Sequence, residues 1–255
     1  MVLKKSNEND KVKVLNMREK VKWMKKVIIW ISIIAVITIL IIFLSDILII
    51  SRNEIIELLE NNKQKDAVNI RVIEKEVGNA EENYTRETSK LNDIEYCKII
   101  MDGEDDYNYI NWVNSTEKKD VVVFLNEKIF NSSTLEVEPI LKNYSLKALE
   151  YFKDKSLYSY KYECLENYNG IKCHVVRAFN ENLAEENYEE VKIWIDIKTG
   201  NCMKYEYFVN EAISSRPEEP YSILEFTYEY DSVKIEEIKE PVESDYPDFK
   251  YTYLY

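Results

Sequence analysis

The residue types that most often do chemistry are scarce in this chain of 255 residues. It contains a single histidine, His174, and only four glycines. His174 follows Cys173 in a candidate strand, where alternation puts adjacent side chains on opposite faces, so a Cys/His nucleophilic pair is disfavoured. A Ser/His/Asp arrangement would need the same histidine, and no nucleophile-elbow motif accompanies it. The sequence therefore predicts a histidine on the sheet surface and no catalytic residue.

Four cysteines are present, at Cys97, Cys164, Cys173 and Cys202. A four-residue loop over residues 167–170 would place Cys164 directly opposite Cys173, where a hairpin disulfide fits, and would leave Cys97 and Cys202 as the remaining pair. The alternative is four buried free thiols, which are common in protein cores. Sequence alone does not fix the connectivity. The chain has no C-x-x-C motif, so a zinc or thioredoxin-like site is disfavoured.

The acidic run from Asp102 to Asp106 is the best candidate for a calcium site, because Ca²⁺ prefers oxygen ligands. It lacks EF-hand spacing and falls where a hairpin turn is needed, so a solvated turn is the favoured interpretation. All four glycines fall in predicted turns, which leaves none for a phosphate-cradling loop. Carboxylate pairs of the kind used in glycoside hydrolysis exist among the acidic residues, but nothing singles one out. We therefore expect no cofactor and no metal.

Charge is divided unequally along the chain. Residues 1 to 26 hold nine Lys or Arg and three Asp or Glu, whereas residues 51 to 255 hold 25 and 43, which gives local balances of +6 and −18. A strongly acidic domain repels phosphates instead of releasing their counterions. Nucleic acid is therefore not an expected partner.

An apolar segment separates the two charged parts. Val27 to Leu44 is a run of 18 residues without a charge, and after Asp46 the apolar residues continue to Ile50. At about 1.5 Å per residue the run spans about 27 Å, close to a hydrocarbon core of about 30 Å. It is longer than the apolar region of a signal peptide and is not followed by a small-residue cleavage site. The sequence predicts an uncleaved transmembrane signal anchor over residues 27–50.

The basic residues near this segment predict its orientation. Residues 12 to 26 hold six Lys or Arg, whereas residues 51 to 65 hold three. Because Lys and Arg close to a membrane helix are retained on the cytoplasmic side, the N-terminus is predicted to be inside. We expect a single-pass protein of the cell membrane, with a cytoplasmic basic tail over residues 1–26 and an extracytoplasmic domain over residues 51–255.

Short β-rich runs separated by turns fill most of that domain. Gly78, Gly103, Gly170 and Gly200 each fall between two candidate strands, where a turn needs positive φ. The predicted strands cover residues 69–77, 83–91, 95–101, 107–113, 121–130 with a break near 126, 157–165, 171–179, 190–196, 202–209 and 223–233. The alternating tyrosines after Pro247 fit a final edge strand.

Two helical segments accompany the strands. Residues 51–65 have an amphipathic pattern, and a second helix is predicted with Pro139 at its first turn. Its apolar positions at helical spacing are Leu141, Tyr144, Ala148, Leu149 and Phe152. Sequential hairpins without βαβ alternation imply an α+β fold, in which an antiparallel sheet carries helices on one face.

The motifs that carry a family resemblance lie in the second half of the chain. They are the stretch from Asn167 to Val176, Trp194-Ile195-Asp196, Thr199-Gly200, and the strand from Cys202 to Val209. A W-I-D strand, a Thr-Gly turn and a following strand resemble the LolA/LolB-like superfamily. The closing segments Phe226 to Tyr230, Glu240-Pro241 and Asp245-Tyr246 are similar to the end of its Gram-positive members, which include the germination lipoprotein GerS.

This resemblance implies an incomplete antiparallel β-barrel, or half-barrel, of about ten strands wrapped over helices. In the family, an apolar concavity holds the acyl chains of lipoproteins or a protein partner. The carrier of that family is soluble, whereas residues 27–50 would tether this chain, so local binding is favoured over carriage between membranes. If Asp196 pairs with Cys202, alternation places a candidate apolar wall on one face of the hairpin. That wall consists of Ile193, Ile195, Met203, Tyr205 and Tyr207.

Three functions therefore stay open at the level of sequence. The first is a non-enzymatic, membrane-anchored domain that binds a lipid, a lipoprotein or an envelope protein in its half-barrel. The second is a structural or regulatory module of the envelope or of spore germination, without lipid cargo. The third is an enzyme with an unrecognised carboxylate site.

Overall fold

The computed structural model describes residues 23–38, 50–77, 83–102, 108–134, 137–180, 188–210 and 217–254. The chain divides into two compact units, Met1–Ile50 and Ser51–Tyr255. The second unit contains the sheet and every core cluster among the described residues, so it has the contacts needed to fold without the first.

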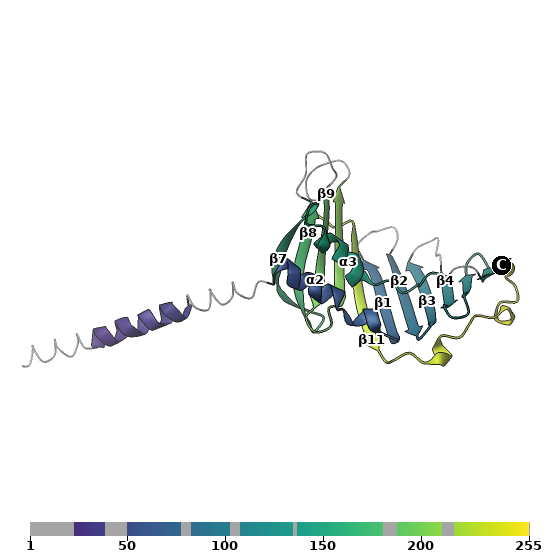
Figure 1. Cartoon of the computed structure of the whole chain (residues 1–255), viewed down its shortest axis with the longest axis horizontal. Coiled ribbons are helices and arrows are strands. Elements are labelled where there is room, and N and C mark those ends of the chain that lie inside the picture. Colours follow the sequence, from purple (N-terminus) through teal and green to yellow (C-terminus); the bar gives the residue numbers. More distant parts are fainter. Residues whose placement is uncertain are drawn as a thin grey trace, which may run out of the picture. The chain divides into compact units, whose positions relative to one another are not determined.

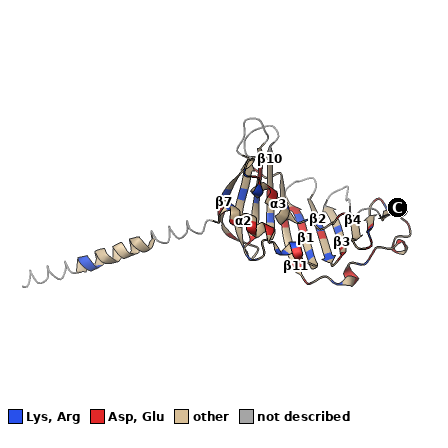
Figure 2. Ribbon diagram, in the orientation of Figure 1, with Lys and Arg blue, Asp and Glu red and all other residues tan. Residues whose placement is uncertain are grey.

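The first unit contains a described helix over residues 23–38. Its basic residues, Lys25 and Lys26, lie close to its start (Figure 2). Among the described residues, no helix is long and apolar enough to cross a membrane. The predicted anchor over residues 27–50 extends into residues 39–49, and the predicted tail into residues 1–22. Both stretches lie outside the described residues, so both assignments stay predictions.

Twelve described strands of the second unit form one sheet, in the order β12-β6-β5-β4-β3-β2-β1-β11-β10-β9-β8-β7. Their bounds are β1 Asn69–Val77, β2 Asn83–Leu91, β3 Ile94–Asp102, β4 Tyr109–Asn114, β5 Lys119–Phe124, β6 Ile129–Ser133, β7 Tyr158–Tyr168, β8 Ile171–Asn180, β9 Tyr188–Asp196, β10 Cys202–Asn210, β11 Ser222–Tyr230 and β12 Lys250–Leu254. Neighbouring strands are antiparallel except for β12, which runs parallel to β6. Since β7 and β12 form the two edges, the described sheet is open and not a closed barrel.

Two short helices cover part of one face of this sheet, which we call the inner face. They are α2 (Arg52–Glu60) and α3 (Tyr144–Lys153), and the 3₁₀ helix η1 (Lys63–Asp66) follows α2. Helix α3 packs against β7 to β10 and against α2 (Figure 1). Arg52 joins the two helices by donating to carbonyl oxygens at the end of α3, including that of Phe152 at 2.7 Å. A cation at this position also complements the negative end of the helix dipole.

The C-terminal segment covers part of the opposite, outer face. After β11 it forms two 3₁₀ turns, η2 (Ile235–Glu237) and η3 (Glu243–Asp245), before entering β12. Tyr246 and Tyr251 pack their rings against Phe130 of β6, and Trp112 of β4 donates its indole N–H to the carbonyl of Ile238 at 3.1 Å. The predicted docking of the tail as an edge strand is confirmed.

The predicted order of strands and helices is largely confirmed, but the sheet has twelve strands and not about ten, because residues 121–130 fall in two strands, β5 and β6, and the tail adds β12. A second correction concerns the second helix. Helix α3 begins at Tyr144, and the side chain of Asn143 caps it by accepting from the N–H of Leu146 at 3.2 Å. Pro139 lies before the helix, in an extended segment over residues 137–143. The helix starts late because Asn143 supplies a side-chain cap, whereas proline supplies only a compatible φ.

The β7–β8 hairpin corrects the predicted cysteine geometry. Its loop has two residues, Asn169 and Gly170, both with positive φ, and not the four that were predicted. Positive φ at both loop positions is the hallmark of a type I′ turn, whose twist matches that of the flanking strands. As a result Cys173 lies opposite Glu166, and Cys164 lies opposite Val175.

All four cysteines are free in the structure, so the predicted Cys164–Cys173 bridge is not formed. Cys164 is exposed on the edge strand, whereas Cys173 is buried. Cys97 and Cys202, the predicted remaining pair, are buried in β3 and β10. Gly78, Gly103 and most of the acidic run after Asp102 lie outside the described residues.

The turn between β9 and β10 joins the sheet to α2. Asp196 holds this turn by accepting from the hydroxyl of Thr199 at 2.6 Å, and the carbonyl of Thr199 accepts from the N–H of Lys63 at 2.7 Å. Gly200 has a φ of +68°, and a Cβ added to it would lie 2.2 Å from the carbonyl oxygen of Leu58. The absence of a side chain at Gly200 therefore permits the close approach of turn and helix.

This contact gives a first prediction. Gly200→Ala in the Ser51–Tyr255 unit should lower the free energy of unfolding by about 3 kcal/mol or more, because a left-handed Ala costs about 1–2 kcal/mol and the clash adds to it. Gly170→Ala is the matched control, since it has a φ of +84° with nothing within 4 Å of an added Cβ. It should cost only about 1–2 kcal/mol. Urea denaturation followed by circular dichroism measures both, and equal losses would contradict the proposed contact.

Candidate functional site

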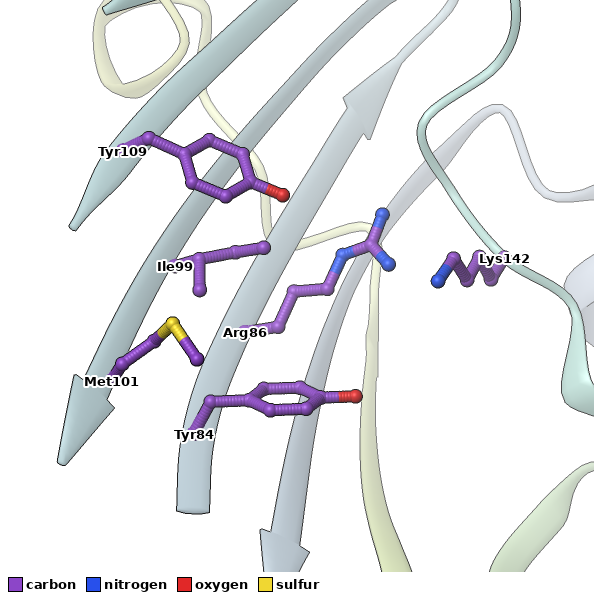
Figure 3. Close-up of a pocket in the computed structure, with 6 residues that line it drawn as sticks. All are labelled: Tyr84, Arg86, Ile99, Met101, Tyr109 and Lys142. Atoms are coloured by element: carbon purple, nitrogen blue, oxygen red, sulfur yellow. The ribbon is translucent and has the colours of Figure 1, made fainter. Parts of the chain in front are cut away.

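The inner face of the sheet carries a cavity at β2 to β4, beside the segment that leads into α3. Its volume is about 270 Å³. Six side chains line it: Tyr84 and Arg86 from β2, Ile99 and Met101 from β3, Tyr109 from β4, and Lys142 (Figure 3). Helix α3 packs on β7 to β10, and among the described residues the segment 137–143 covers this part of the inner face.

Strand register explains why these side chains meet. Tyr84 lies opposite Met101, and Arg86 lies opposite Ile99, which in turn lies opposite Tyr109. Alternation along each strand sends all five side chains to the same face. The cavity is thus a patch of neighbouring side chains on three adjacent strands.

Arg86 is the buried one of the two charged residues that line the cavity, and it is only 7% exposed. It lies directly opposite Glu74 of β1, but the two form no ion pair within the structure described. Its Nε donates to the sulfur of Cys97 at 3.3 Å, and its Nη2 donates to the carbonyl of Ile140. Burial works against the charged form, but Cys97 and Glu74 outweigh it and raise the pKa of Arg86, so the guanidinium stays protonated.

Glu74 is buried and is engaged by two phenols. Its Oε1 accepts from the hydroxyl of Tyr84 at 2.5 Å and from that of Tyr144 in α3 at 3.1 Å. Burial, followed by the charge of Glu74, raises the pKa of both tyrosines, so both remain donors. The Glu74 carboxylate therefore links β1, β2 and α3.

Glu95 of β3 fastens the covering segment to the sheet. One of its carboxylate oxygens accepts from the backbone N–H groups of Ile140 at 2.6 Å and Leu141 at 2.9 Å. Its other oxygen lies 3.6 Å from Nζ of Lys90. A segment laid across a sheet without pairing as a strand leaves buried backbone donors that need partners. Glu95 and Arg86 supply partners for the N–H and the C=O of the same residue, Ile140.

Two further polar groups face the cavity without a partner among the described residues. Lys142 is exposed, and its amino group points toward the guanidinium of Arg86 (Figure 3). The hydroxyl of Tyr109 also points toward the side of the cavity where Arg86 lies. Burial raises the pKa of Tyr109, so this hydroxyl is a proton donor. Ile99 and Met101 supply the apolar wall.

The lining of the cavity has the composition of a ligand-binding pocket. Within the described part of the chain, no group of three His, Cys, Asp or Glu side chains lies close enough to hold a metal ion. The cavity wall combines aromatic and apolar surface with a few polar groups at one end, as ligand pockets usually do. His174 lies in β8, outside the cavity, and the centroid of its ring is 6.0 Å from that of Tyr162. Burial lowers the pKa of His174.

The predicted apolar wall lies under α3 and does not line the cavity. Ile193 and Ile195 are fully buried, and Tyr205 packs its ring against Tyr144 at 6.0 Å. The hydroxyl of Tyr207 donates to Glu189 at 3.1 Å.

Met203 is the exception among the predicted wall residues, because it packs with Trp194 in a cluster on the outer face. The predicted register is off by one residue at Cys202, which lies opposite Ile195; a bulge follows, and from Lys204, which lies opposite Trp194, the predicted register holds. That extra residue turns the Met203 side chain away from the inner face.

The six cavity residues were missed from sequence, although one signal existed. In β2, Tyr84, Arg86 and Thr88 alternate on one face, and a charged residue in the middle of such a stripe is unusual for a face that packs against other structure. Nothing in the sequence shows that Lys142, which is 56 positions after Arg86, reaches the same space.

The sequence matches no protein-family model, and a search of curated proteins finds no significant relative. Solved structures that are similar include a DUF1329 family protein from Desulfovibrio piger, with a TM-score of 0.32 and 14% identity over 74% of this chain and 97% of that chain. The Pseudomonas aeruginosa MucA/MucB complex gives a TM-score of 0.44 and 8% identity over 74% of this chain and 61% of that chain. A structure described as an outer membrane lipoprotein-sorting protein domain from Vibrio parahaemolyticus gives a TM-score of 0.31 and 11% identity over 74% of this chain and 97% of that chain. These low values carry no conclusion about function, and the resemblance to GerS-like proteins stays a prediction.

The fastening of residues 137–143 gives a second prediction. Glu95→Gln should speed hydrogen exchange at the amides of Ile140 and Leu141 about tenfold or more, because a neutral amide oxygen accepts more weakly than a buried carboxylate. Glu87→Gln is the control: Glu87 contacts Arg71 at 3.1 Å on the outer face and should leave both amides unchanged. Unchanged exchange in Glu95→Gln would show that the segment is held by other contacts.

Proposed function

We propose that the Ser51–Tyr255 unit is a non-enzymatic binding module that holds a lipid, or the lipid part of a lipidated partner, in the cavity over β2 to β4. The observation that carries this proposal is the cavity itself, which lies where the inner face is not covered by α2 and α3. Its wall is mostly apolar and aromatic, and burial of apolar surface is the main source of affinity for such ligands.

We further propose that residues 27–50 anchor this unit in the cell membrane, with residues 1–26 in the cytoplasm. Large apolar side chains of the described helix support the anchor, because Ile29, Ile31 and Ile34 are each more than half exposed. Exposed isoleucines in a row are costly in water and favourable in hydrocarbon. Binding would then take place just outside the membrane, at a source of amphiphilic ligands.

Filling the cavity tests the proposed binding function. The Ser51–Tyr255 unit should carry a bound mass in native mass spectra that organic extraction removes. Met101→Trp places a larger side chain in the cavity and should lower the occupied fraction about tenfold or more, since overpacked sites exclude ligand.

The neighbouring residue provides the matched control for this experiment. Ile100 lies next to Met101 in β3 but is 41% exposed on the outer face. Ile100→Trp should therefore keep the bound mass. Loss of the bound mass in both variants would point to general damage, and retention in both would place the ligand elsewhere.

The cysteines allow a direct test of the predicted topology. Cys164 is exposed, whereas Cys97, Cys173 and Cys202 are buried, so a membrane-impermeant maleimide should label the folded chain at one position. Intact cells that produce the full chain should be labelled, and Cys164→Ser should abolish the signal. A mildly alkaline buffer is needed because burial raises the pKa of the Cys164 thiol. Labelling only after lysis would place the domain inside the cell.

A further inference from the structure

We infer that the cavity selects ligands with an anionic head: a carboxylate or a phosphate monoester at the end of a single apolar chain. Arg86, Lys142 and Tyr109 bind the head, and Ile99 and Met101 contact the first part of the chain. This inference rests on the proposed function and adds to it the class of ligand that the site prefers.

The first argument is the charge inside the cavity. Arg86 and Lys142 direct their cationic ends toward the same space, and none of the six lining residues is a carboxylate (Figure 3). Neither cation forms an ion pair with any described residue. Two like charges that share a partly buried space repel each other, and an anion between them removes the repulsion.

The second argument is that the nearby carboxylates are already engaged. Glu74, directly opposite Arg86, is bound by the hydroxyls of Tyr84 and Tyr144. Glu95 is bound by the backbone of Ile140 and Leu141. The charge of Glu74 acts on Arg86 without an ion-pair contact between them, and neither acid lines the cavity, so an anion in the cavity meets no carboxylate on its wall.

The third argument is the supply of free donors. A guanidinium has five N–H groups, and the contacts of Arg86 with Cys97 and Ile140 use one on Nε and one on Nη2. The remaining donors of Arg86, the ammonium of Lys142 and the hydroxyl of Tyr109 have no acceptor among the described residues. Carboxylates and phosphates are the acceptors that such a set binds most strongly.

The volume of the cavity, its apolar wall and the net charge of the protein further restrict the class of ligand. A volume of 270 Å³ corresponds to about nine water-sized groups, which is enough for a head and a short length of one chain. The apolar wall favours a chain over a free inorganic anion. Because residues 51–255 carry a net charge of −18, the protein as a whole repels anions, and any preference for them must come from these local cations.

The experiment compares ligands that differ only in the head. Calorimetry with the Ser51–Tyr255 unit should give decanoate and decyl phosphate an affinity about tenfold or more above that of decanol, and inorganic phosphate no measurable affinity. Lys142→Glu reverses one cation at an exposed position, so the fold should be kept, and it should remove the difference between decanoate and decanol. Lys98→Glu is the control. Lys98 is exposed in β3 and does not line the cavity, and its substitution changes the net charge by the same amount.

Each outcome separates the two proposals. Equal binding of decanoate and decanol, unchanged by Lys142→Glu, would overturn the anionic preference and leave the lipid-binding function standing. Absence of binding by all the decyl compounds would overturn the proposed function. Tight binding of inorganic phosphate alone would mean that the site takes a free anion, which contradicts a chain-bearing ligand. An equal loss in Lys98→Glu would assign the effect to net charge and would also overturn the inference.

Discussion

Helices of nine and ten residues cannot cover one face of a twelve-stranded sheet, and the rest of the structure follows from that shortage. A half-buried antiparallel strand needs an apolar partner on one face. Helix α3 covers β7 to β10 on the inner face, while the C-terminal segment packs on the outer face of β4 to β6. At β2 to β4 the inner face is left to an extended segment, and the cavity forms beneath and beside it.

That extended segment makes the site polar as well as apolar. It does not pair as a strand, so its backbone groups need side-chain partners when they are buried. Glu95 and Arg86 provide those partners at Ile140, and both charges are thereby held inside the protein. The Glu95 carboxylate accepts hydrogen bonds from two N–H groups, whereas the Arg86 guanidinium has further N–H donors that the segment does not use. Arg86 of β2 thus holds the extended segment in place and also offers donors to a ligand. Lys142, which belongs to the extended segment, lines the same cavity.

How far the sequence predicts this structure depends on the range of the interactions involved. The β2 range 83–91 was predicted correctly, because alternation and flanking turns are local. The start of α3 was placed too early, because Pro139 fits a first turn but Asn143 provides the hydrogen-bonded cap. The β7–β8 register was misjudged by two positions, because the loop has two residues and not four, so Cys164 lies opposite Val175 instead of Cys173. The β9–β10 register was wrong at Cys202 alone, where a bulge follows, and a one-position error there puts Met203 on the other face.

The sequence by itself determined the run of strands and helices, the acidic character of residues 51–255, the apolar segment from Val27 to Leu44 and the absence of a recognisable catalytic motif, since each depends on composition or neighbouring residues. Tertiary structure alone decided which side chains share the cavity. Arg86 and Lys142 are far apart in sequence, and Arg86 sits opposite Glu74 in a register that would normally produce an ion pair. Only the packing of Tyr84 and Tyr144 onto Glu74, and of residues 137–143 over the sheet, redirects the guanidinium into the cavity.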